Sequence, residues 1–418
     1  MNKIDLKPLK GFRDFYPEQM RFRNFLFGKM RETSKLFGYE EYEGPTLEPI
    51  EIYTAKSDEE LIKNQTFILK DKNDKSLAMR PELTPTLARM VAAKQNELVF
   101  PLRWFSIGPR WRYEQPQKGR FREFWQWDID LIGETSLKAD AEIIAVACNF
   151  LKNLGLTPKE VVIKINNRRF LQEKIKAIKI SSDKINPVYK AIDKKDKMTT
   201  NEWENYLREI VGSKKQTKDL KSILEEKAFG NFQELTELFA LLKKFGVEEY
   251  VEFDPTIIRG LDYYTGTVFE VRDKEGKFRA ILGGGRYDNL VGLFGDKKIP
   301  GVGFAAGDAT LEEVLKKFNK TSKIENNNKI LVTVFNESLT EKSFELSQKL
   351  RTAGIANELY LTPEKIEKQL KYADKKGVKY VVIIGPDEDK NKTVTIKDLS
   401  TGRQSTIALD KINQFFGF

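Results

Sequence analysis

The run Arg259-Gly-Leu-Asp-Tyr-Tyr-Thr-Gly-Thr-Val-Phe-Glu270 places an arginine, an acid and two tyrosines directly before a candidate strand. Residues 267–271 have the branched and aromatic composition of a buried strand. A buried strand does not require charged side chains in the turn before it, because Arg and Asp are rarely buried unless they are paired. The run therefore predicts the wall of a polar pocket, with an ordinary turn around a buried tyrosine pair as the alternative.

The length and charge of the chain limit what surrounds this pocket. With 418 residues we expect two or three domains. The net charge of +10 favours a polyanionic partner, although a lysine-rich solvated surface is an equal alternative. No apolar run is long enough to span a membrane, and residues 1–10 lack the apolar stretch of a signal peptide. We therefore expect a cytoplasmic protein with no membrane partner.

The chain contains no histidine and one cysteine, Cys148. These counts exclude imidazole acid–base catalysis, nucleophiles activated by histidine, and zinc sites built from Cys and His. Because Cys148 follows an apolar stretch, we expect it to be a small buried hydrophobe, and we expect no protein-bound metal. Chemistry must then rely on arginines, carboxylates, amides, tyrosines and backbone dipoles, which suit reactions of phosphate groups.

The first half of the chain predicts helices around a sheet. Residues 18–37 predict an amphipathic helix, and residues 39–45 a strand that ends at Gly-Pro. Residues 66–133 alternate short strands with charged turns, as in an antiparallel sheet with one solvated face. Further helices are expected over residues 85–95 and 138–154.

The second half predicts three further parts. Residues 170–250 are lysine-rich and helical, as in an insertion, and Gly283-Gly-Gly-Arg-Tyr-Asp288 predicts a glycine-rich turn that enters a helix. After a polar linker, strands over residues 330–335 and 380–384 alternate with helices and predict a small α/β domain. The helices of this domain are expected over residues 341–353 and 363–376. A closing hairpin is expected to start at residues 393–397 and to have Gly402 in its turn.

Residues 107–126 form a strongly basic strand–loop–strand segment. It holds four arginines and a lysine, interleaved with Trp111, Phe121, Phe124 and Trp125. A solvated hairpin with charged edges would not explain those aromatic residues. The segment therefore predicts an anion-binding hairpin.

Two carboxylates directly follow this segment. Asp128 and Asp130 are two residues apart, so on a strand they share one face. Their burial would be costly unless other groups pair with them.

These separated motifs resemble those of histidyl-tRNA synthetases, which are class II aminoacyl-tRNA synthetases. The opening run is similar to their histidine-binding signature, residues 107–126 resemble the second class II motif, and Arg80-Pro-Glu-Leu-Thr84 resembles their Arg-Pro-Glu-x-Thr. The first helix, strand and proline resemble the first class II motif, which forms the dimer interface. The C-terminal hairpin resembles that of the anticodon-binding domain appended to several class II synthetases.

The resemblance implies an α+β fold: an antiparallel-sheet class II synthetase catalytic domain with a helical insertion, plus a C-terminal α/β anticodon-binding domain. The expected boundaries are 1–169 for the first part of the catalytic core, 170–250 for the insertion, 251–318 for the second part of the core, 319–329 for a linker and 330–418 for the anticodon-binding domain.

The resemblance also implies a role for individual residues. Arg112 and Arg259 would be catalytic and would contact the α-phosphate of ATP. Asp130 would accept a ring N–H of histidine, with Tyr264 at the other ring nitrogen, and Asp128 is a candidate for orienting an Arg or Tyr. The implied ATP-binding residues are Arg112, Glu114, Arg120 and Phe124. The implied histidine-binding residues are Glu82, Thr84, Arg112, Gln126, Asp130, Arg259, Tyr263 and Tyr264.

The implied function is ATP-dependent activation of L-histidine and its ligation to tRNA(His), with Mg²⁺ bound to ATP and a homodimer as the assembly. Three positions depart from the family pattern: Trp125 replaces a common His, Gln115 replaces an Arg typical of bacterial members, and Thr310 replaces the Arg of the third class II motif. Thr310 supports an alternative, a non-catalytic regulatory or histidine-sensing relative, which the intact basic hairpin and C-terminal domain oppose. A tRNA-binding module without chemistry is a third alternative.

Overall fold

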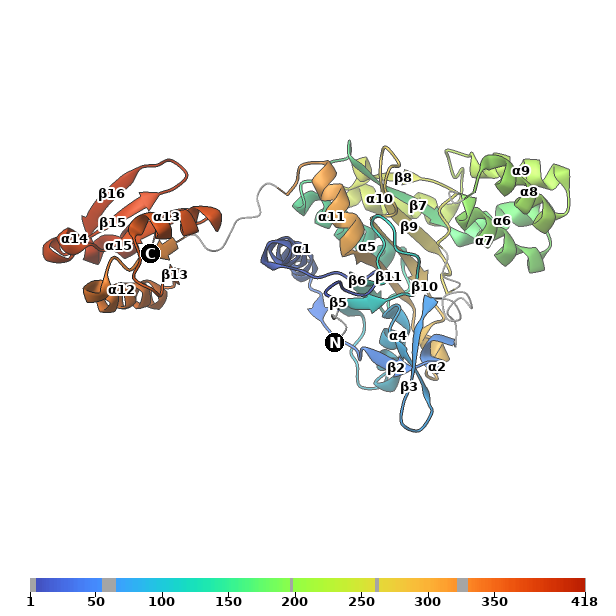
Figure 1. Ribbon diagram of the computed structural model, residues 1–418. Helices are drawn as coiled ribbons and strands as arrows, with labels where there is room; N and C mark the ends of the chain where they lie inside the picture. Colours follow the sequence, from blue (N-terminus) through green and yellow to red (C-terminus); the bar gives the residue numbers. More distant parts are fainter. Residues whose placement is uncertain (1–4, 55–64, 196–197, 260–262, 322–329, 418) are drawn as a thin grey trace. The chain divides into compact units, whose positions relative to one another are not determined.

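The computed structural model describes residues 5–54, 65–195, 198–259, 263–321 and 330–417. The chain divides into two compact units, residues 1–322 and 323–418 (Figure 1). Each unit has its own hydrophobic core. In the described part of the chain, no helix is both long enough and apolar enough to cross a membrane.

A large, mainly antiparallel sheet organises the first unit. Among the described residues it has eight strands in the order β1-β5-β6-β11-β10-β9-β7-β8. The pairs from β5 to β7 are antiparallel, and the two edge pairs, β1 with β5 and β7 with β8, are parallel. The strands are β1 (Glu40–Glu41), β5 (Leu102–Trp111), β6 (Glu123–Ile132), β7 (Val161–Asn167), β8 (Val251–Phe253), β9 (Thr267–Asp273), β10 (Leu282–Tyr287) and β11 (Gly301–Gly307). The predicted antiparallel sheet is therefore confirmed.

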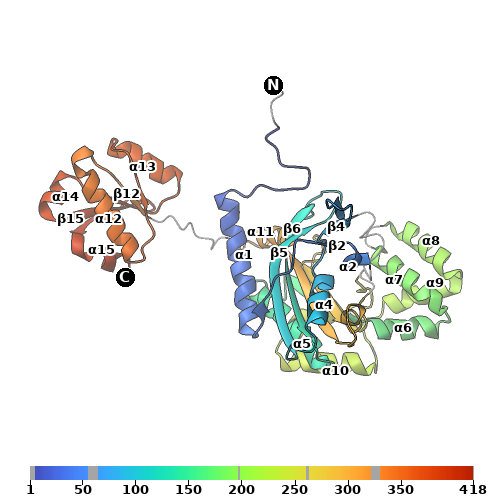
Figure 2. The same ribbon diagram turned by 90° about the horizontal axis from the view of Figure 1, so that it is seen from below.

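Helix α5 (Leu137–Asn153) is the centre of the layer that covers one face of this sheet. It is apolar around most of its circumference because it packs against the sheet, against α1 (Pro17–Leu36) and against α10 (Gln233–Lys244) (Figure 2). Trp127 of β6 contacts Phe150 of α5, with 4.8 Å between the ring centroids. Cys148 is buried in this layer, as its apolar neighbours predicted.

A smaller sheet of the first unit is formed by strands that precede the next long helix in the sequence. Its strands β2 (Leu47–Pro49), β4 (Ser76–Met79) and β3 (Phe67–Lys70) pair in antiparallel order, and α2 (Glu51–Thr54) follows β2. Helix α4 (Thr84–Ala93) begins directly after the turn that contains Arg80 and Glu82. The sequence predicted α4 within a few residues of its observed ends, and it predicted short strands in the region that contains β3 and β4.

The lysine-rich region is helical, as predicted, and its first helices cluster beside one end of the large sheet (Figure 1). Gly212 ends one of them with a φ of +81°, a left-handed conformation that favours glycine. The last helix, α10, instead packs on α5. The helices of the cluster are α6 (Arg168–Ala177), α7 (Ile185–Asp193), α8 (Thr200–Val211) and α9 (Lys214–Leu224), with the 3₁₀ turn η1 (Ser182–Lys184); η3 (Glu248–Tyr250) follows α10.

The second unit is the predicted α/β domain. Its five described strands lie in the order β13-β12-β14-β15-β16; β12 is parallel to both neighbours, and the other pairs are antiparallel. The elements are β12 (Ile330–Val332), η5 (Glu337–Leu339), α12 (Thr340–Thr352), β13 (Glu358–Leu359), α13 (Ile366–Lys375), β14 (Tyr380–Ile383), α14 (Pro386–Asn391), β15 (Thr393–Asp398), β16 (Gln404–Ala408), η6 (Leu409–Lys411) and α15 (Ile412–Phe415). Together the two units confirm the expected α+β fold.

Two expectations about local structure were wrong. Residues 283–288, expected as a glycine-rich turn entering a helix, belong mostly to β10, which is paired on both sides and is followed by the short 3₁₀ turn η4 (Val291–Leu293). The strand expected over residues 39–45 is only the two-residue β1. Residues 260–262 of the opening run and residues 322–329 of the expected linker lie outside the described residues.

Candidate active site

Alternate glycines on β10 make room for side chains of the opening run. A Cβ built on Gly283 would lie 2.7 Å from the guanidinium carbon of Arg259, and one on Gly285 would lie 2.9 Å from the Tyr264 ring. Successive strand residues face opposite sides, so these two glycines share one face of β10 with Tyr287. That face is the floor of the candidate site.

Asp130 lies on β6, two strands away from β10. It is buried and accepts a hydrogen bond from the Tyr287 hydroxyl, with 2.6 Å between the oxygens. Burial raises the pKa of Asp130 to about 8; the Tyr287 hydrogen bond lowers it, and the negative charge of Asp128 adds to the rise. On the neighbouring β11, a Cβ on Gly303 would overlap the Asp130 carboxylate, so glycine leaves the space that Asp130 occupies.

Asp128 has a different environment although it shares this face of β6. Its carboxylate accepts a hydrogen bond from Arg110 Nη2 at 2.7 Å, and both side chains are buried. Asp128 therefore pairs with an arginine, one of the two kinds of partner that the sequence suggested for it. Asp130 makes no ion pair in the described part of the chain, so a ligand can supply its missing hydrogen-bond donor.

Tyr42 is a further polar group near Asp130. Its hydroxyl is buried and has no hydrogen-bond partner among the described residues. The pKa of Tyr42 is raised well above its usual value, by burial first and then by the negative charge of Asp130. A buried hydroxyl without a partner beside a carboxylate without a cation indicates room for a polar ligand.

Glu82 supplies a second carboxylate to the same region. It is buried and accepts a hydrogen bond from the Tyr263 hydroxyl at 3.1 Å. Arg80 fixes the turn before it by donating to Glu43 Oε1 at 2.5 Å and to the Gly44 carbonyl at 2.7 Å. We call this region the inner pocket, defined by Tyr42, Glu82, Asp130, Tyr263, Tyr264 and Tyr287.

A cavity of about 1250 Å³ adjoins the inner pocket. We call it the arginine cavity, because its lining includes Arg112, Arg120, Arg259, Arg272 and Arg279. Three other predicted site residues line the cavity: Glu114, Phe124 and Gln126. Thr310 also lines it.

Arg112 and Arg259 connect the cavity to the inner pocket. Arg112 Nε donates to the carbonyl of Pro81, next to Glu82, at 2.9 Å, and its guanidinium carbon lies 5.3 Å from the centroid of the Phe124 ring. Arg259 donates to Glu270 at 2.8 Å, while its buried Nε has no hydrogen-bond partner in the described residues. Arg259 adopts a φ of +60°, which is uncommon for a residue with a side chain and is often associated with functional sites.

Glu114 and Arg120, both expected to bind ATP, form an ion pair with each other in this structure. The pair lies in the loop between β5 and β6. Both side chains therefore have to change partners before each could bind a separate part of a nucleotide.

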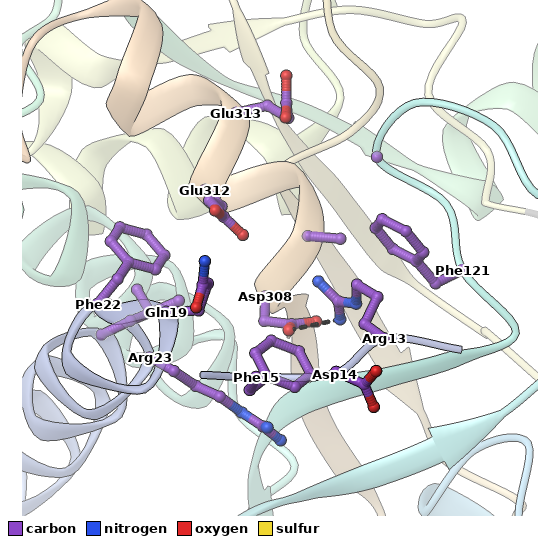
Figure 3. Close-up of a pocket in the computed structure, with 13 residues that line it drawn as sticks. Arg13, Asp14, Phe15, Gln19, Phe22, Arg23, Phe121, Asp308, Glu312 and Glu313 are labelled. Carbon is purple, nitrogen blue, oxygen red and sulfur yellow. Dashed lines mark hydrogen bonds and ion pairs between the residues drawn. The ribbon is translucent and has the colours of Figure 1, made fainter. Parts of the chain in front are cut away.

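Asp308, the first residue of α11 (Asp308–Lys317), lies beside Arg13 and near Phe121 of the same loop (Figure 3). Asp308 accepts hydrogen bonds from Arg13 Nη2 at 2.8 Å and from the Trp125 amide at 3.0 Å. The Arg13 guanidinium carbon in turn lies 4.0 Å from the centroid of the Phe121 ring. These contacts border a second pocket of about 390 Å³ and fix the base of the basic hairpin.

Sequence reasoning missed Tyr42, Tyr287, Arg110 and the Arg13–Asp308 pair. Tyr287 could have been found if residues 282–287 had been interpreted as a strand, because the period of two puts it on the face of Gly283 and Gly285. Nothing local in the sequence indicates Tyr42 or the pairing of Arg13 with Asp308, which are 295 residues apart.

Comparisons with known proteins show which families the chain resembles. A family model described as histidyl-tRNA synthetase matches residues 11–311, and one described as an anticodon binding domain matches residues 329–416. The chain is 38% identical to a histidine–tRNA ligase of Leptospira biflexa, covering 99% of this chain and 98% of that protein. It is 36% identical to the chloroplastic/mitochondrial histidine–tRNA ligase of Arabidopsis thaliana, over 98% of this chain and 86% of the relative. The crystal structure of histidyl-tRNA synthetase from Nostoc sp. PCC 7120 superposes with a TM-score of 0.84 at 27% identity and covers 99% of each chain.

Proposed function

The chain belongs to the histidyl-tRNA synthetase family, and from this premise we propose that its inner pocket binds histidine and its arginine cavity binds ATP. As a class II aminoacyl-tRNA synthetase it activates histidine with ATP and ligates it to tRNA(His). The observation that carries our assignment of the sites is the place of Arg112 and Arg259, which line the cavity and border the inner pocket.

We propose that Asp130 accepts a ring N–H of the histidine substrate and that Tyr264 meets the other ring nitrogen. A carboxylate and a phenol on opposite sides demand a planar ring with two nitrogens, because any other side chain would leave buried polar groups unpaired. Glu82, held by Tyr263, would bind the α-ammonium group together with Thr84 and Gln126, since a carboxylate and two neutral acceptors satisfy its three donors.

The first reaction then needs no side-chain base. A carboxylate oxygen of histidine attacks the α-phosphorus, an O–P bond forms, and the bond from the α-phosphorus to the pyrophosphate oxygen breaks. Arg112 and Arg259 would stabilise the negative charge of the transition state from two sides. Mg²⁺ would enter with ATP as part of the substrate and neutralise charge on its phosphates.

ATP binding would separate the ion pair between Glu114 and Arg120. Glu114 would then accept from the adenine amino group and Arg120 would bind the outer phosphates, while Phe124 stacks on the base. Arg120 would thereby exchange one charged partner for another, and Glu114 would exchange its charged partner for a neutral hydrogen-bond donor.

In the second reaction the histidyl group passes to the 3′ end of tRNA and AMP leaves. The second unit, which matches an anticodon-binding family, would hold the other end of the tRNA. We also propose a homodimer and a cytoplasmic location. Sedimentation and fractionation of cells would measure these two properties.

The test of this site assignment is histidine-dependent ATP–pyrophosphate exchange. The unmodified chain should catalyse the exchange, and Arg259→Ala should lower its rate roughly 100- to 1000-fold while histidine still binds, because the lost interaction acts on the transition state. Arg208→Ala is the control, since Arg208 is an exposed arginine of α8 that bonds Asn205 and does not line the cavity, so this variant should retain most activity.

Two outcomes would contradict the assignment. Loss of histidine binding with unchanged single-turnover chemistry would place Arg259 in ground-state recognition. An unmodified chain that binds histidine but shows no exchange would favour the non-catalytic alternative.

A further inference from the structure

The charges that line the arginine cavity are not balanced by one another. Glu270 binds both Arg259 and Arg272, Glu114 is paired with Arg120, and Glu275 is paired with Lys277. Arg112 and Arg279 make no ion pair in the part of the chain that the structure describes. The cavity therefore has guanidinium charge available for an anionic ligand.

Arg279 is close enough to the other arginines to affect their titration. The pKa of Arg120 is lowered to about 10, by burial first and then by the positive charges of Arg279 and Arg112. Three guanidinium groups thus face one region of the cavity, and a polyanion in that region would relieve their repulsion.

The loop that carries Arg279 is anchored on both sides. Before it, the amides of Lys277 and Phe278 donate to the Asp273 carboxylate at 2.9 and 3.0 Å. After it, the amide of Ile281 donates to the carbonyl of Val271 at 2.8 Å. The backbone at Arg279 is therefore positioned before a ligand arrives, which lowers the entropic cost of binding.

The part of helix α11 that lines the cavity offers no cation. Helix α11 contributes Ala309 and Thr310 to the lining. A Cβ built on Gly119 would lie 3.7 Å from the Thr310 hydroxyl oxygen, so this short side chain faces the loop between β5 and β6. The positive charge that binds a long anion in the cavity must then come from other residues of its lining.

We propose that Arg279 binds the β- and γ-phosphates of ATP together with Arg120, while Arg112 holds the α-phosphate. This inference rests on the proposed use of the cavity for ATP. It assigns a contact with the outer phosphates to the β9–β10 loop.

The test measures binding of ATP and of AMP in the absence of histidine. Arg279→Ala should weaken ATP binding roughly 10- to 100-fold, the effect of one lost charge-assisted hydrogen bond, and leave AMP binding unchanged. Arg279→Lys should retain part of the ATP affinity, because it keeps the charge but not the forked geometry. Lys277→Ala is the control: it removes one positive charge from the same loop, but that charge is already paired with Glu275.

Each result has a definite meaning. Unchanged ATP binding in Arg279→Ala, or an equal loss for Lys277→Ala, would overturn the proposal. Equal weakening of ATP and AMP would place Arg279 at the base or the α-phosphate and would also overturn it. Because these titrations contain no histidine, they are separate from the exchange assay, whose failure in the unmodified chain would contradict the proposed function.

Discussion

Among the described residues of the inner pocket, Asp130 is the carboxylate that most clearly lacks a charged partner. Asp128, two residues earlier, is neutralised by Arg110, whereas the donor to Asp130 among the described residues is the uncharged Tyr287 hydroxyl. A buried carboxylate with neutral partners is stabilised in its protonated form, which explains its raised pKa. A donor from the ligand would change that balance.

Asp130→Asn should weaken histidine binding roughly 10- to 100-fold, because an amide is a poorer acceptor for the ring N–H and adds a misplaced donor. The KM for ATP should stay the same, since Asp130 does not line the arginine cavity. Calorimetric titration with histidine and exchange kinetics measure the two quantities. An equal loss of ATP affinity would show that Asp130 acts on the nucleotide.

The same variant should change how the stability of the empty protein depends on pH. A carboxyl whose folded pKa is about 8 binds a proton more readily in the folded state than in the unfolded state. Its contribution is complete at low pH and is lost as pH rises from about 4 to 8. Asp130→Asn lacks this loss, so its free energy of unfolding relative to the unmodified chain should rise over that range, by roughly 5 kcal/mol. Urea unfolding at pH 5 and pH 9 measures the difference; a pH-independent difference would contradict the buried titration.

Strands β10 and β11 show why elements were harder to predict than single site residues. Helices α1, α4 and α5 and the basic hairpin have clear periodicity or charge, which a sequence displays locally. In contrast, three consecutive glycines usually mark a turn. Here they are in a strand, and the strand requires glycine because a Cβ on Gly284 would overlap the carbonyl of Gly303 on the adjacent strand, a contact between residues that are distant in the sequence.

The residues of the candidate site also divide into those that the sequence displays locally and those that depend on contacts between distant segments. Arg112, Glu114, Arg120, Phe124 and Gln126 follow one another in the chain, so their shared cavity could be expected from the hairpin alone. Which side chains complete the inner pocket depends on how β6, β10 and the turn before α4 meet. The sequence motifs supplied Glu82, Asp130 and Tyr263, whereas Tyr287 and the pairing of each hydroxyl with its carboxylate depend on the fold.

A glycine on β11 provides a test at this scale. Gly303→Ala should destabilise the first unit by about 1–3 kcal/mol and impair histidine binding, because its Cβ would overlap the Asp130 carboxylate. Gly307→Ala is the matched control on the same strand, since nothing lies within 4 Å of its Cβ position. Thermal unfolding and histidine titration of both variants measure these effects. If Gly303→Ala behaved like Gly307→Ala, the tight fit at Asp130 would be wrong.

The whole molecule consists of two units with separate cores, and each therefore has the means to fold by itself. The chain remains attached to the first unit as far as Lys320, whose ammonium group lies 3.0 Å from Glu160. Thr321 is the last described residue before the second unit.

A truncated chain that ends at Thr321 should fold and retain most pyrophosphate exchange, because the inner pocket and the arginine cavity lie in the first unit. Its charging of tRNA should fall by at least roughly 100-fold, the scale expected when one of two linked binding modules is lost. Exchange and aminoacylation assays on the same preparation separate the two activities. Full aminoacylation by the truncated chain would contradict a tRNA-binding role for the second unit.

The inner pocket can be studied by nuclear magnetic resonance through the imidazole ring of the bound substrate. The chain contains no histidine of its own, so every imidazole signal from a complex with one bound substrate comes from that substrate. The chemical shifts of its two ring carbon protons depend on whether the ring is charged. A titration from pH 5 to pH 9 would therefore show whether the proton shared with Asp130 resides on the substrate or on the enzyme, without isotopic labelling of the protein.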